Sequence, residues 1–391
     1  MVIAGDIGSK NSFLGIFQED EKGMPVLAKY PDRDEPILVK WPTTDYDNLE
    51  SLVEAFLQQS GIEEPICAAC FGISGPVSNG KGNIVTKKST WNLSEDNLCD
   101  LLIKQYWKKN ECDAAKEQRI VRVINSLEGI DFSALLKTDK IFDLNQPNAT
   151  EQTAIEHQRC ALLGVRDNLG EALVHWGNLP NGDEGYVVSF SEGGHSNFAP
   201  SSKEEVKLLN YLLEHPEYLD HPEPVTYEDV LSRKGIVSIY RFIQDEVKGQ
   251  ETLDGLEELI KQEAFEEAAE KIMIAALNEE NAVCEKTIDC FFSIYGAEAG
   301  NLALKYYALG GVYYLRGALT PQGLIGKLVD KLQHGAFMQA FTRRAKPSVR
   351  ELLESIPVKL IDYPRIRLFG AARLALDKEG IGCILHDKIC K

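Results

Sequence analysis

The sequence predicts an α/β protein organised as two domains or as one large α/β unit. Its 391 residues exceed what one hydrophobic core usually fills. Hydrophobic residues make up 44% of the chain and charged residues 26%, as in globular proteins rather than in disordered or fibrous ones. Short apolar, β-branched runs and segments with helical spacing of apolar residues occur in the same chain, which indicates both strands and helices.

Net charge and hydropathy exclude several classes of partner. The 60 acidic and 42 basic side chains give a net charge of −18, which repels nucleic acid and anionic membranes. No segment has the roughly 18 consecutive apolar residues of a membrane span, and the first residues lack a basic region before an apolar one. We therefore expect a cytoplasmic protein with no nucleic-acid partner and no membrane partner.

The nine cysteines are odd in number and scattered through apolar segments, as expected of reduced thiols. Cys67 and Cys70 form a C-x-x-C motif, but they lie in a strand-like apolar run and no second pair stands at zinc spacing. Packing is favoured over metal binding or redox chemistry, and no metal site is expected.

The first part of the chain predicts a hairpin followed by strands and helices. Residues 1–17 are apolar on both sides of Gly-Asp-Ile-Gly-Ser, which predicts two strands joined by a tight turn with Asp6 at the bend. Residues 45–59 combine helical spacing with an acidic first turn. Residues 65–77 are typical of a buried strand, and Ser94 precedes a second helix.

Two later strands end at polar residues. Residues 119–128 predict a strand that delivers Asn125 and Ser126 at its carboxyl end, where ligands gather in open α/β sheets. Residues 184–190 predict a strand that leads into Ser-Glu-Gly-Gly-His, where two glycines let the backbone turn sharply and bring the glutamate and histidine together. The pattern of residues 227–301 is mostly helical and strongly acidic.

A series of short motifs covers nearly the whole chain. They are Asp6-Ile-Gly-Ser-Lys-Asn11, Ser74-Gly-Pro-Val77, Trp91-Asn-Leu93, Asn125-Ser-Leu-Glu128, Ser191-Glu-Gly-Gly-His-Ser-Asn-Phe-Ala-Pro200, Glu228-Asp-Val-Leu-Ser-Arg-Lys-Gly235, Gly296-Ala-Glu-Ala-Gly-Asn301 and Gly310-Gly-Val-Tyr313. In this order they resemble the motifs of the bacterial-type glucokinases. The resemblance implies a two-domain actin-like ATPase (ribonuclease H-like) sugar-kinase fold with a ligand cleft between the domains.

The resemblance also implies a hexose site. Asn125, Glu192, His195 and Glu228 match four of the five sugar-binding positions of the family. An uncharged hexose presents a ring of hydroxyls, so a selective site needs fixed hydrogen-bond donors and acceptors. The alternative is that the two acids and the histidine only brace the Gly-Gly turn.

The fifth position, which is catalytic in the family, differs in this chain. The family places an aspartate there to take the proton of the C6 hydroxyl as it attacks the γ-phosphate, and this chain has Ser126. Loss of a positioned general base typically costs about 10²–10⁴-fold in rate. Glu128 and Asp131 are the alternative bases, although both are displaced along the chain.

The first phosphate loop of the family, G-G-T-N, is altered. Asp6 and Gly8 match, but Ser9 and Lys10 replace the second glycine and the threonine, whose backbone and hydroxyl would bind phosphate.

The second phosphate loop differs more strongly. The family reads G-P-G-T-G-L-G-V-A where this chain has Gly164-Val-Arg-Asp-Asn-Leu-Gly-Glu-Ala172. Arg166, Asp167 and Asn168 therefore crowd a place where bare backbone approaches the triphosphate. At about 4 Å and an effective dielectric near 20, the charge of Asp167 opposes each phosphate charge by about 4 kcal/mol.

On the base and ribose side of the implied nucleotide site, Gly310 and Gly311 are kept, but Arg316 replaces a family glycine. Arginine can stack on a purine, yet a filled and inactive site is the favoured interpretation.

These features predict a glucokinase-like pseudoenzyme that retains a hexose site but lacks the catalytic base and both phosphate loops. It would act as a sugar-binding protein or as a structural subunit of an assembly. One alternative is an active glucokinase that transfers the γ-phosphate of ATP to the 6-hydroxyl of glucose, and another is an enzyme with a different phosphoryl donor.

No cofactor is expected, except Mg-ATP if the kinase is active. The expected partners are weakly bound glucose or a related hexose, proteins of an assembly, and a second copy in a homodimer. The predicted small domain comprises residues 1–135 and 364–391, and the large domain comprises residues 136–363.

Overall fold

The structure is a computed structural model of the chain. It describes residues 1–21, 23–64, 66–106, 120–147, 157–179, 184–219, 224–246, 252–316, 323–363 and 365–377. The chain forms two compact units. The small unit comprises Met1–Lys137, Trp176–Phe190 and Arg365–Lys391, and the large unit comprises Thr138–His175 and Ser191–Pro364.

The predicted division differs from these units at Trp176–Phe190, which we had placed in the large domain. The ring of Tyr186 in this segment makes an edge-to-face contact with Phe132 of the small unit, with 5.2 Å between centroids.

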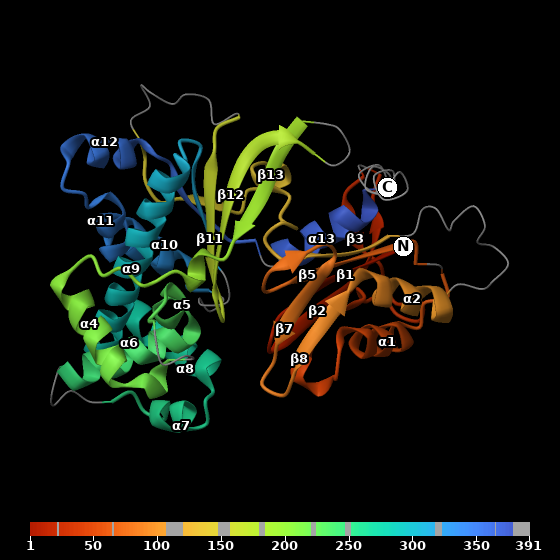
Figure 1. Ribbon diagram of the computed structural model, residues 1–391, viewed down its shortest axis with the longest axis horizontal. Helices are drawn as coiled ribbons and strands as arrows, with labels where there is room; N and C mark the ends of the chain where they lie inside the picture. The colour runs from red at the N-terminus through yellow and green to blue at the C-terminus, as the bar shows by residue number, and fades with distance from the viewer. Residues whose placement is uncertain are drawn as a thin grey trace. The chain divides into compact units, whose positions relative to one another are not determined.

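A mixed sheet forms the centre of the small unit (Figure 1). Its strand order is β3-β2-β1-β5-β9, and β4 also pairs with β2. The parallel pairing of β1, β5 and β9 aligns Ile7, Ile73 and Asn125 at the carboxyl edge. The strands are β1 (Val2–Ile7), β2 (Asn11–Glu19), β3 (Pro25–Leu27), β4 (Leu38–Pro42), β5 (Ala68–Ile73) and β9 (Ile120–Asn125), with a separate sheet of β6 (Val77–Ser78), β7 (Lys81–Val85) and β8 (Thr90–Ser94).

Helices cover both faces of the β1–β5–β9 sheet. Alternation along β1 directs Ile3 and Ile7 into the core beneath α1 and α2, and Val2 and Ala4 into the core beneath α13. Figure 1 shows α13 separated from α1 and α2 by the sheet. The helical elements of this unit are η1 (Thr43–Asp45), α1 (Leu49–Ser60), α2 (Glu95–Tyr106), α3 (Phe132–Leu135) and α13 (Ile366–Leu376).

The first helix begins later than residue 45, where we predicted it. Asn48 is its N-cap, because the Asn48 side chain accepts a hydrogen bond from Ser51 N at 2.8 Å and the Ser51 hydroxyl reaches back to the N-cap backbone. Residues 43–45 form the separate 3-10 turn η1. A capping box therefore sets the start of α1. The acidic residues that the sequence analysis placed in the first turn of the helix lie before that start.

A second six-stranded sheet has the order β10-β15-β14-β11-β12-β13. Most of its strands and the helical elements named below belong to the large unit, whereas β12 from Trp176 and β13 up to Phe190 belong to the small unit. The strands of this sheet are β10 (Ile141–Asp143), β11 (Cys160–Val165), β12 (Leu169–Asn178), β13 (Glu184–Ser191), β14 (Gly311–Leu315) and β15 (Val358–Ile361). The helical elements are η4 (Gly193–His195), α4 (Lys203–Glu214), η5 (Pro216–Tyr218), α5 (Tyr227–Val230), α6 (Arg233–Glu246), α7 (Leu256–Lys261), α8 (Phe265–Leu277), α9 (Ala282–Tyr306), α10 (Ile325–His334), α11 (Ala336–Thr342) and α12 (Pro347–Ser355).

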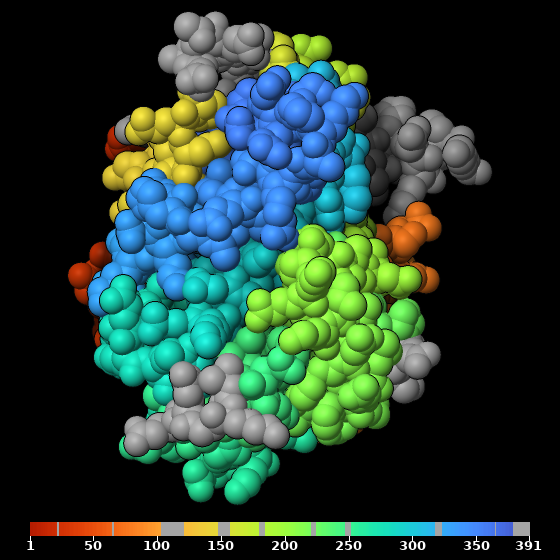
Figure 2. Space-filling model, turned by 90° about the vertical axis from the view of Figure 1, so that its left-hand side faces the viewer, coloured from red at the N-terminus to blue at the C-terminus, as the bar shows by residue number. Residues whose placement is uncertain are grey.

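The long helix α9 is the centre of the helical layer and contributes buried residues along most of its length. Gly296 and Gly300 let α11 approach it closely, because an added Cβ would lie 2.1 Å from Phe337 O and 2.6 Å from Phe341 O, respectively. Figure 2 shows the face of this unit formed by the segments around α4 (yellow-green), α8 (teal) and α10 to α12 (blue). The mostly helical pattern predicted for residues 227–301 is confirmed, because α5 to α9 contain most of the described residues of this range.

Candidate functional site

Glu192 and His195 lie in a tight turn that follows β13. The turn η4 is closed by hydrogen bonds from His195 N to Glu192 O (3.1 Å) and from Ser196 N to Gly193 O (2.9 Å). Short-range backbone bonds therefore hold both side chains on one small loop of the large unit.

The two glycines of the turn are required by space rather than by backbone conformation, which corrects our sequence interpretation. Neither Gly193 nor Gly194 has a positive φ. A Cβ on Gly193 would lie 1.9 Å from Glu171 Oε2, and one on Gly194 would lie 2.5 Å from Leu169 O. The turn thus packs directly onto the start of β12.

His195 lies between two glutamates. Its Nε2 is 3.6 Å from Glu192 Oε2, and its Nδ1 is 3.4 Å from Glu228 Oε2. Burial raises the pKa of Glu192, and His195 opposes this shift. The structure therefore brings together three of the predicted sugar-binding side chains, which offer carboxylate acceptors and an imidazole in one place.

Glu228 is held beside the turn by the start of α5. Thr226 and Asp229 form a capping box, in which Thr226 N donates to Asp229 Oδ2 at 2.8 Å. Tyr227 N donates to Ser196 O at 3.0 Å, so the first turn of α5 is bonded directly to the loop that carries His195.

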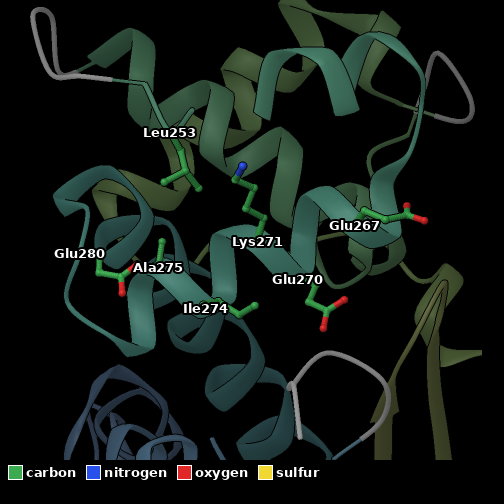
Figure 3. A pocket seen from close by; sticks show the side chains of 7 residues that line it. All are labelled: Leu253, Glu267, Glu270, Lys271, Ile274, Ala275 and Glu280. Atoms are coloured by element: carbon green, nitrogen blue, oxygen red, sulfur yellow. The ribbon is translucent and has the colours of Figure 1, made fainter. Parts of the chain in front are cut away.

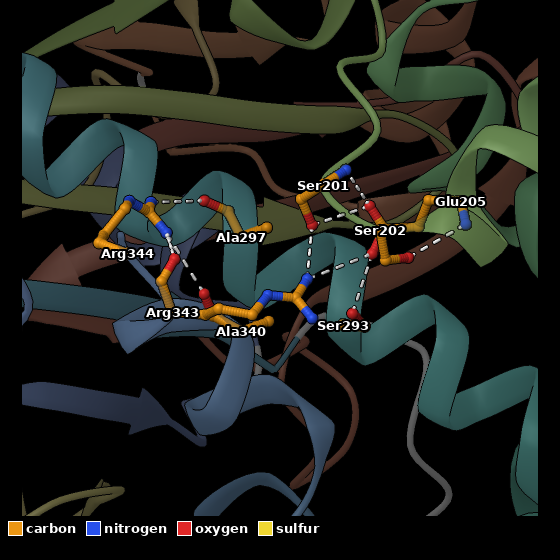
Figure 4. Close-up of polar contacts among 8 residues, drawn as sticks. All are labelled: Ser201, Ser202, Glu205, Ser293, Ala297, Ala340, Arg343 and Arg344. Carbon is orange, nitrogen blue, oxygen red and sulfur yellow. Dashed lines mark hydrogen bonds and ion pairs between the residues drawn. The ribbon is translucent and has the colours of Figure 1, made fainter. Parts of the chain in front are cut away.

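The segment after the turn is anchored by the buried side chain of Glu205. Its Oε2 accepts hydrogen bonds from Ser201 N (2.6 Å) and Ser201 Oγ (2.9 Å), and its Oε1 accepts one from Ser293 Oγ (3.0 Å). Arg343 donates to Ser201 Oγ at 2.7 Å. Figure 4 shows these groups converging from α4, α9 and the end of α11, so three helices fix the chain beyond His195.

Asn125 and Ser126 belong to the small unit, and both are buried. Asn125 Nδ2 donates to Gly75 O and its Oδ1 accepts from Leu127 N, each at 2.9 Å. One amide hydrogen and one lone pair of Asn125 remain for a ligand. Ser126 N donates to Ile73 O at 2.9 Å, and the residue is 4% exposed.

The two alternative bases are already engaged in structural contacts. Asp131 Oδ1 accepts from Ala134 N at the start of α3, and its Oδ2 is 2.7 Å from Arg373 Nε. Glu128 Oε2 accepts from Asn125 N at 3.1 Å, and burial raises the pKa of this carboxyl group. Asp131 is therefore used as a helix cap and an ion-pair partner, and Glu128 supports the turn after β9.

The N-terminal hairpin differs from its prediction in one respect. Asp6 lies within β1, opposite Phe13, and not at the bend. Gly8 N donates to Asn11 O at 3.1 Å, and Thr43 N donates to Lys10 O at 2.9 Å. The backbone of the turn is thus bonded within the hairpin and to the start of η1.

The connection between β11 and β12 is a three-residue turn made of Arg166, Asp167 and Asn168, in which Arg166 N donates to Asn168 O at 3.0 Å. Arg233 Nη1 pairs with Asp167 Oδ1 and Arg233 Nη2 pairs with Glu266 Oε1, both at 2.9 Å. The pair with Arg233 weakens the predicted repulsion between Asp167 and a phosphate, but Arg233 is shared with Glu266, so the three side chains together keep one negative charge. The three side chains of this turn still occupy the space that the glycine-rich loop of the family would leave open.

The later nucleotide-side residues also have structural contacts. Gly311 has φ +122° and begins β14, and Gly310 N donates to Arg159 O at 2.8 Å. Arg316 Nε pairs with Asp362 Oδ1 at 2.6 Å, so this guanidinium is held next to the residue that follows β15. The residue after Arg316 lies outside the described part of the chain. The β11–β12 turn contains three side chains and no glycine, and the loss of nucleotide binding stays a prediction.

Two buried acids near the turn were missed by the sequence reasoning. Glu171 on β12 and Glu298 on α9 are each 1% exposed. Burial and the charge of Glu298 raise the pKa of Glu171 to about 8, and Lys305 opposes this. The signal in the sequence that could have identified Glu171 is an acid inside the otherwise apolar start of β12.

A cavity of about 300 Å³ lies elsewhere in the large unit (Figure 3). Its lining consists of Leu253, Glu267, Glu270, Lys271, Ile274, Ala275 and Glu280. Figure 3 shows its three glutamates spread around the cavity rather than directed to one point, and it contains none of the predicted site residues.

Three further observations concern metals, thiols and membranes. Among the described residues, no group of three or more His, Cys, Asp or Glu side chains is placed to hold a metal ion. Burial raises the pKa of the Cys70 thiol to about 12, which suits a packing role. Within the described ranges, none of the helices is long and apolar enough to span a membrane.

Comparisons with known proteins agree on the family. A family model described as Glucokinase matches residues 3–378. The glucokinase of Nostoc punctiforme is 30% identical over 386 residues, which cover 96% of this chain and 98% of that protein. Two solved glucokinases have TM-scores of 0.62 (an Antarctic psychrotroph, 23% identity, 96% and 98% covered) and 0.63 (Balamuthia mandrillaris with glucose, 19% identity, 96% and 93% covered).

These likenesses confirm the predicted fold, that of the actin-like ATPase sugar kinases. Because the family model matches nearly every residue from the first strand to the last helix, the chain belongs to the glucokinase family.

Proposed function

We propose that this protein is a hexose-binding member of the glucokinase family that no longer transfers phosphoryl groups. One observation carries the proposal: Ser126, which is 4% exposed, stands where the resemblance places the catalytic aspartate, and both nearby acids, Glu128 and Asp131, already accept structural hydrogen bonds. A serine hydroxyl does not accept the proton of an attacking alcohol near neutral pH. The protein would act as a sugar sensor or as a subunit of an assembly.

Retention of the sugar site is supported by the cluster of Glu192, His195 and Glu228. The two glutamates lie within 3.6 Å of the His195 imidazole, and the three side chains offer hydrogen-bonding groups to a ring of hydroxyls. The related glucokinase of Balamuthia mandrillaris was solved with glucose, which favours a hexose as the ligand.

An active glucokinase is the second candidate. The ion pair between Arg233 and Asp167 favours it, because this pair weakens the electrostatic repulsion between Asp167 and a nucleotide at the β11–β12 turn. The relatives of 25–30% identity are also named as glucokinases. In that case Mg-ATP would be the phosphoryl donor, and a base other than Ser126 would be needed.

A coupled assay for glucose 6-phosphate separates the two candidates. We expect no turnover above the uncatalysed background with ATP, GTP or pyrophosphate at high protein concentration. Turnover near the roughly 1–100 s⁻¹ of ordinary kinases would overturn the proposal in favour of an active enzyme.

Calorimetric titration with glucose tests the retained site. We expect weak binding that is lost in Glu192→Ala and preserved in Glu214→Ala, an exposed acid at the end of α4 that serves as the control. Absence of heat in the unmodified protein at tens of millimolar sugar would show that the cluster is only structural.

Localisation and partners are part of the same proposal. We place the protein in the cytosol, because its cysteines suit reduced packing thiols. Sedimentation velocity over a range of concentrations would show whether it forms the proposed homodimer.

A further inference from the structure

A buried carboxyl group lies directly beneath the turn that carries Glu192 and His195. Glu171 is the third residue of β12 and is 1% exposed. A Cβ on Gly193 would lie 1.9 Å from Glu171 Oε2, so the carboxyl group occupies the space that any other residue at that position would need. The turn therefore packs against an ionisable group.

The backbone of the turn is also tied to this residue. Ser191 Oγ donates to Glu171 O at 3.4 Å and accepts a hydrogen bond from Gly193 N at 3.2 Å. A single hydroxyl thus bridges β12 and the first glycine. Movement of the Glu171 backbone would reach the turn through this bridge, and movement of its side chain would reach the turn through the packing against Gly193.

The surroundings of Glu171 do not suit an ionised carboxylate. Its Oε1 has no hydrogen-bond partner among the described residues. The nearest charged groups on α9 are Glu298 and Lys305, and Lys305 already pairs with Glu298 Oε1 at 3.1 Å. The other titratable groups around the turn are Glu192, His195, Tyr227 and Glu228.

Burial first, and the charge of Glu298 second, raise the pKa of Glu171 to about 8. The group is therefore neutral at pH 7 and ionises under mildly alkaline conditions. An ionised carboxylate at this buried position needs water or a hydrogen-bond donor to stabilise its charge. If the side chain moves to reach one, the glycine turn that packs against it must also move. The family pattern has a valine here, which fills similar space and carries no charge.

We propose that Glu171 is a positioning residue: in its neutral form it supports the Glu192–His195 turn in the hexose-binding arrangement, and its ionisation releases the turn. This inference rests on the proposed hexose site. It predicts that the affinity of that site for a hexose falls at alkaline pH.

Amide hydrogen exchange tests the proposal without sugar. The reporters are the amides of Gly193, His195 and Ser196, which are bonded within the turn. After correction for intrinsic base catalysis, we expect their protection to fall about tenfold or more between pH 6.5 and 9.5, with a midpoint near the pKa of about 8. Residues 203–214 of α4 are the internal control and should keep their protection.

Glu171→Gln is the matched variant, because it keeps the size of the side chain and removes its ionisation. We expect constant protection of the turn in this variant over the same pH range. Constant protection in the unmodified protein, or an alkaline loss that persists in Glu171→Gln, would overturn the proposal.

A second variant keeps the test decisive if Glu171→Gln does not fold. Glu298→Gln removes the charge that raises the pKa of Glu171, so the exchange midpoint should move to lower pH, whereas the exposed Glu214→Gln should leave it unchanged. An unmoved midpoint in Glu298→Gln counts against the proposal.

Calorimetry with glucose at the same pH values separates this inference from the proposed function. If the exchange midpoint is present and depends on Glu171, the positioning role stands even where no sugar binds at any pH. In that outcome only the hexose-binding function fails. If sugar binds, we expect its Kd to rise with the same midpoint and to be independent of alkaline pH in Glu171→Gln.

Discussion

Arg233 and Asp167 form a 2.9 Å ion pair that joins the first residue of α6 to the turn between β11 and β12. The Arg233 side chain is 5% exposed and also pairs with Glu266, so one buried cation is shared by two acids. This arrangement makes the altered loop a stable structural element.

Arg233→Met should lower the free energy of unfolding by about 2–3 kcal/mol, because it leaves two partly exposed carboxylates without their cation. Chemical denaturation measures the change. Lys207→Met, which breaks the exposed pair with Glu246, is the control and should cost under about 1 kcal/mol. Equal effects in the two variants would contradict the structural role of the buried pair.

Ser126→Asp alone should not restore phosphoryl transfer, because the β11–β12 turn still carries the side chains of Arg166, Asp167 and Asn168. Adding Arg166→Gly, Asp167→Thr and Asn168→Gly should give activity, and returning residue 126 to Ser in that background should lower it by about 10²–10⁴-fold. The coupled glucose 6-phosphate assay measures both. Full activity from Ser126→Asp by itself would mean that the turn is no obstacle to ATP.

Glucose should raise the melting temperature, and millimolar Mg-ATP should not. A ligand at 100 times its Kd contributes about 2.7 kcal/mol, which is readily detected as a thermal shift. Differential scanning fluorimetry with each ligand alone checks this, with galactose as a stereochemical control. A shift with ATP would show that the altered loops still bind a nucleotide.

Gly194→Ala should be more damaging than Gly193→Ala. The new Cβ at 194 would lie 2.5 Å from a backbone oxygen of Leu169, whereas the one at 193 meets the end of the Glu171 side chain, which can shift. Thermal denaturation and glucose titration should rank the two variants in this order. Gly326→Ala is the control: nothing lies within 4 Å of its Cβ, so it should leave stability unchanged or raise it by up to about 1 kcal/mol.

The sequence by itself determined the family, the order of most strands and helices, and the identities that bear on catalysis. Periodicity and turn residues are local signals, so β1, β5, β9 and the strand before Glu192 could be predicted without coordinates. The presence of Ser126 where the resemblance implies an aspartate is likewise visible in the sequence alone, and the loss of catalysis stays a prediction.

Only the tertiary structure decided which charges are compensated and what lies beneath the Gly-Gly turn. Arg233 is 66 residues from Asp167 in the sequence, and Glu298 comes from a helix far along the chain from β12. No local pattern specifies such pairs, because they depend on which side chains the packed helices and sheet bring within a few ångströms. For the same physical reason, Glu171 appears in the sequence as one acid in an apolar strand, and its burial against Gly193 follows only from the fold.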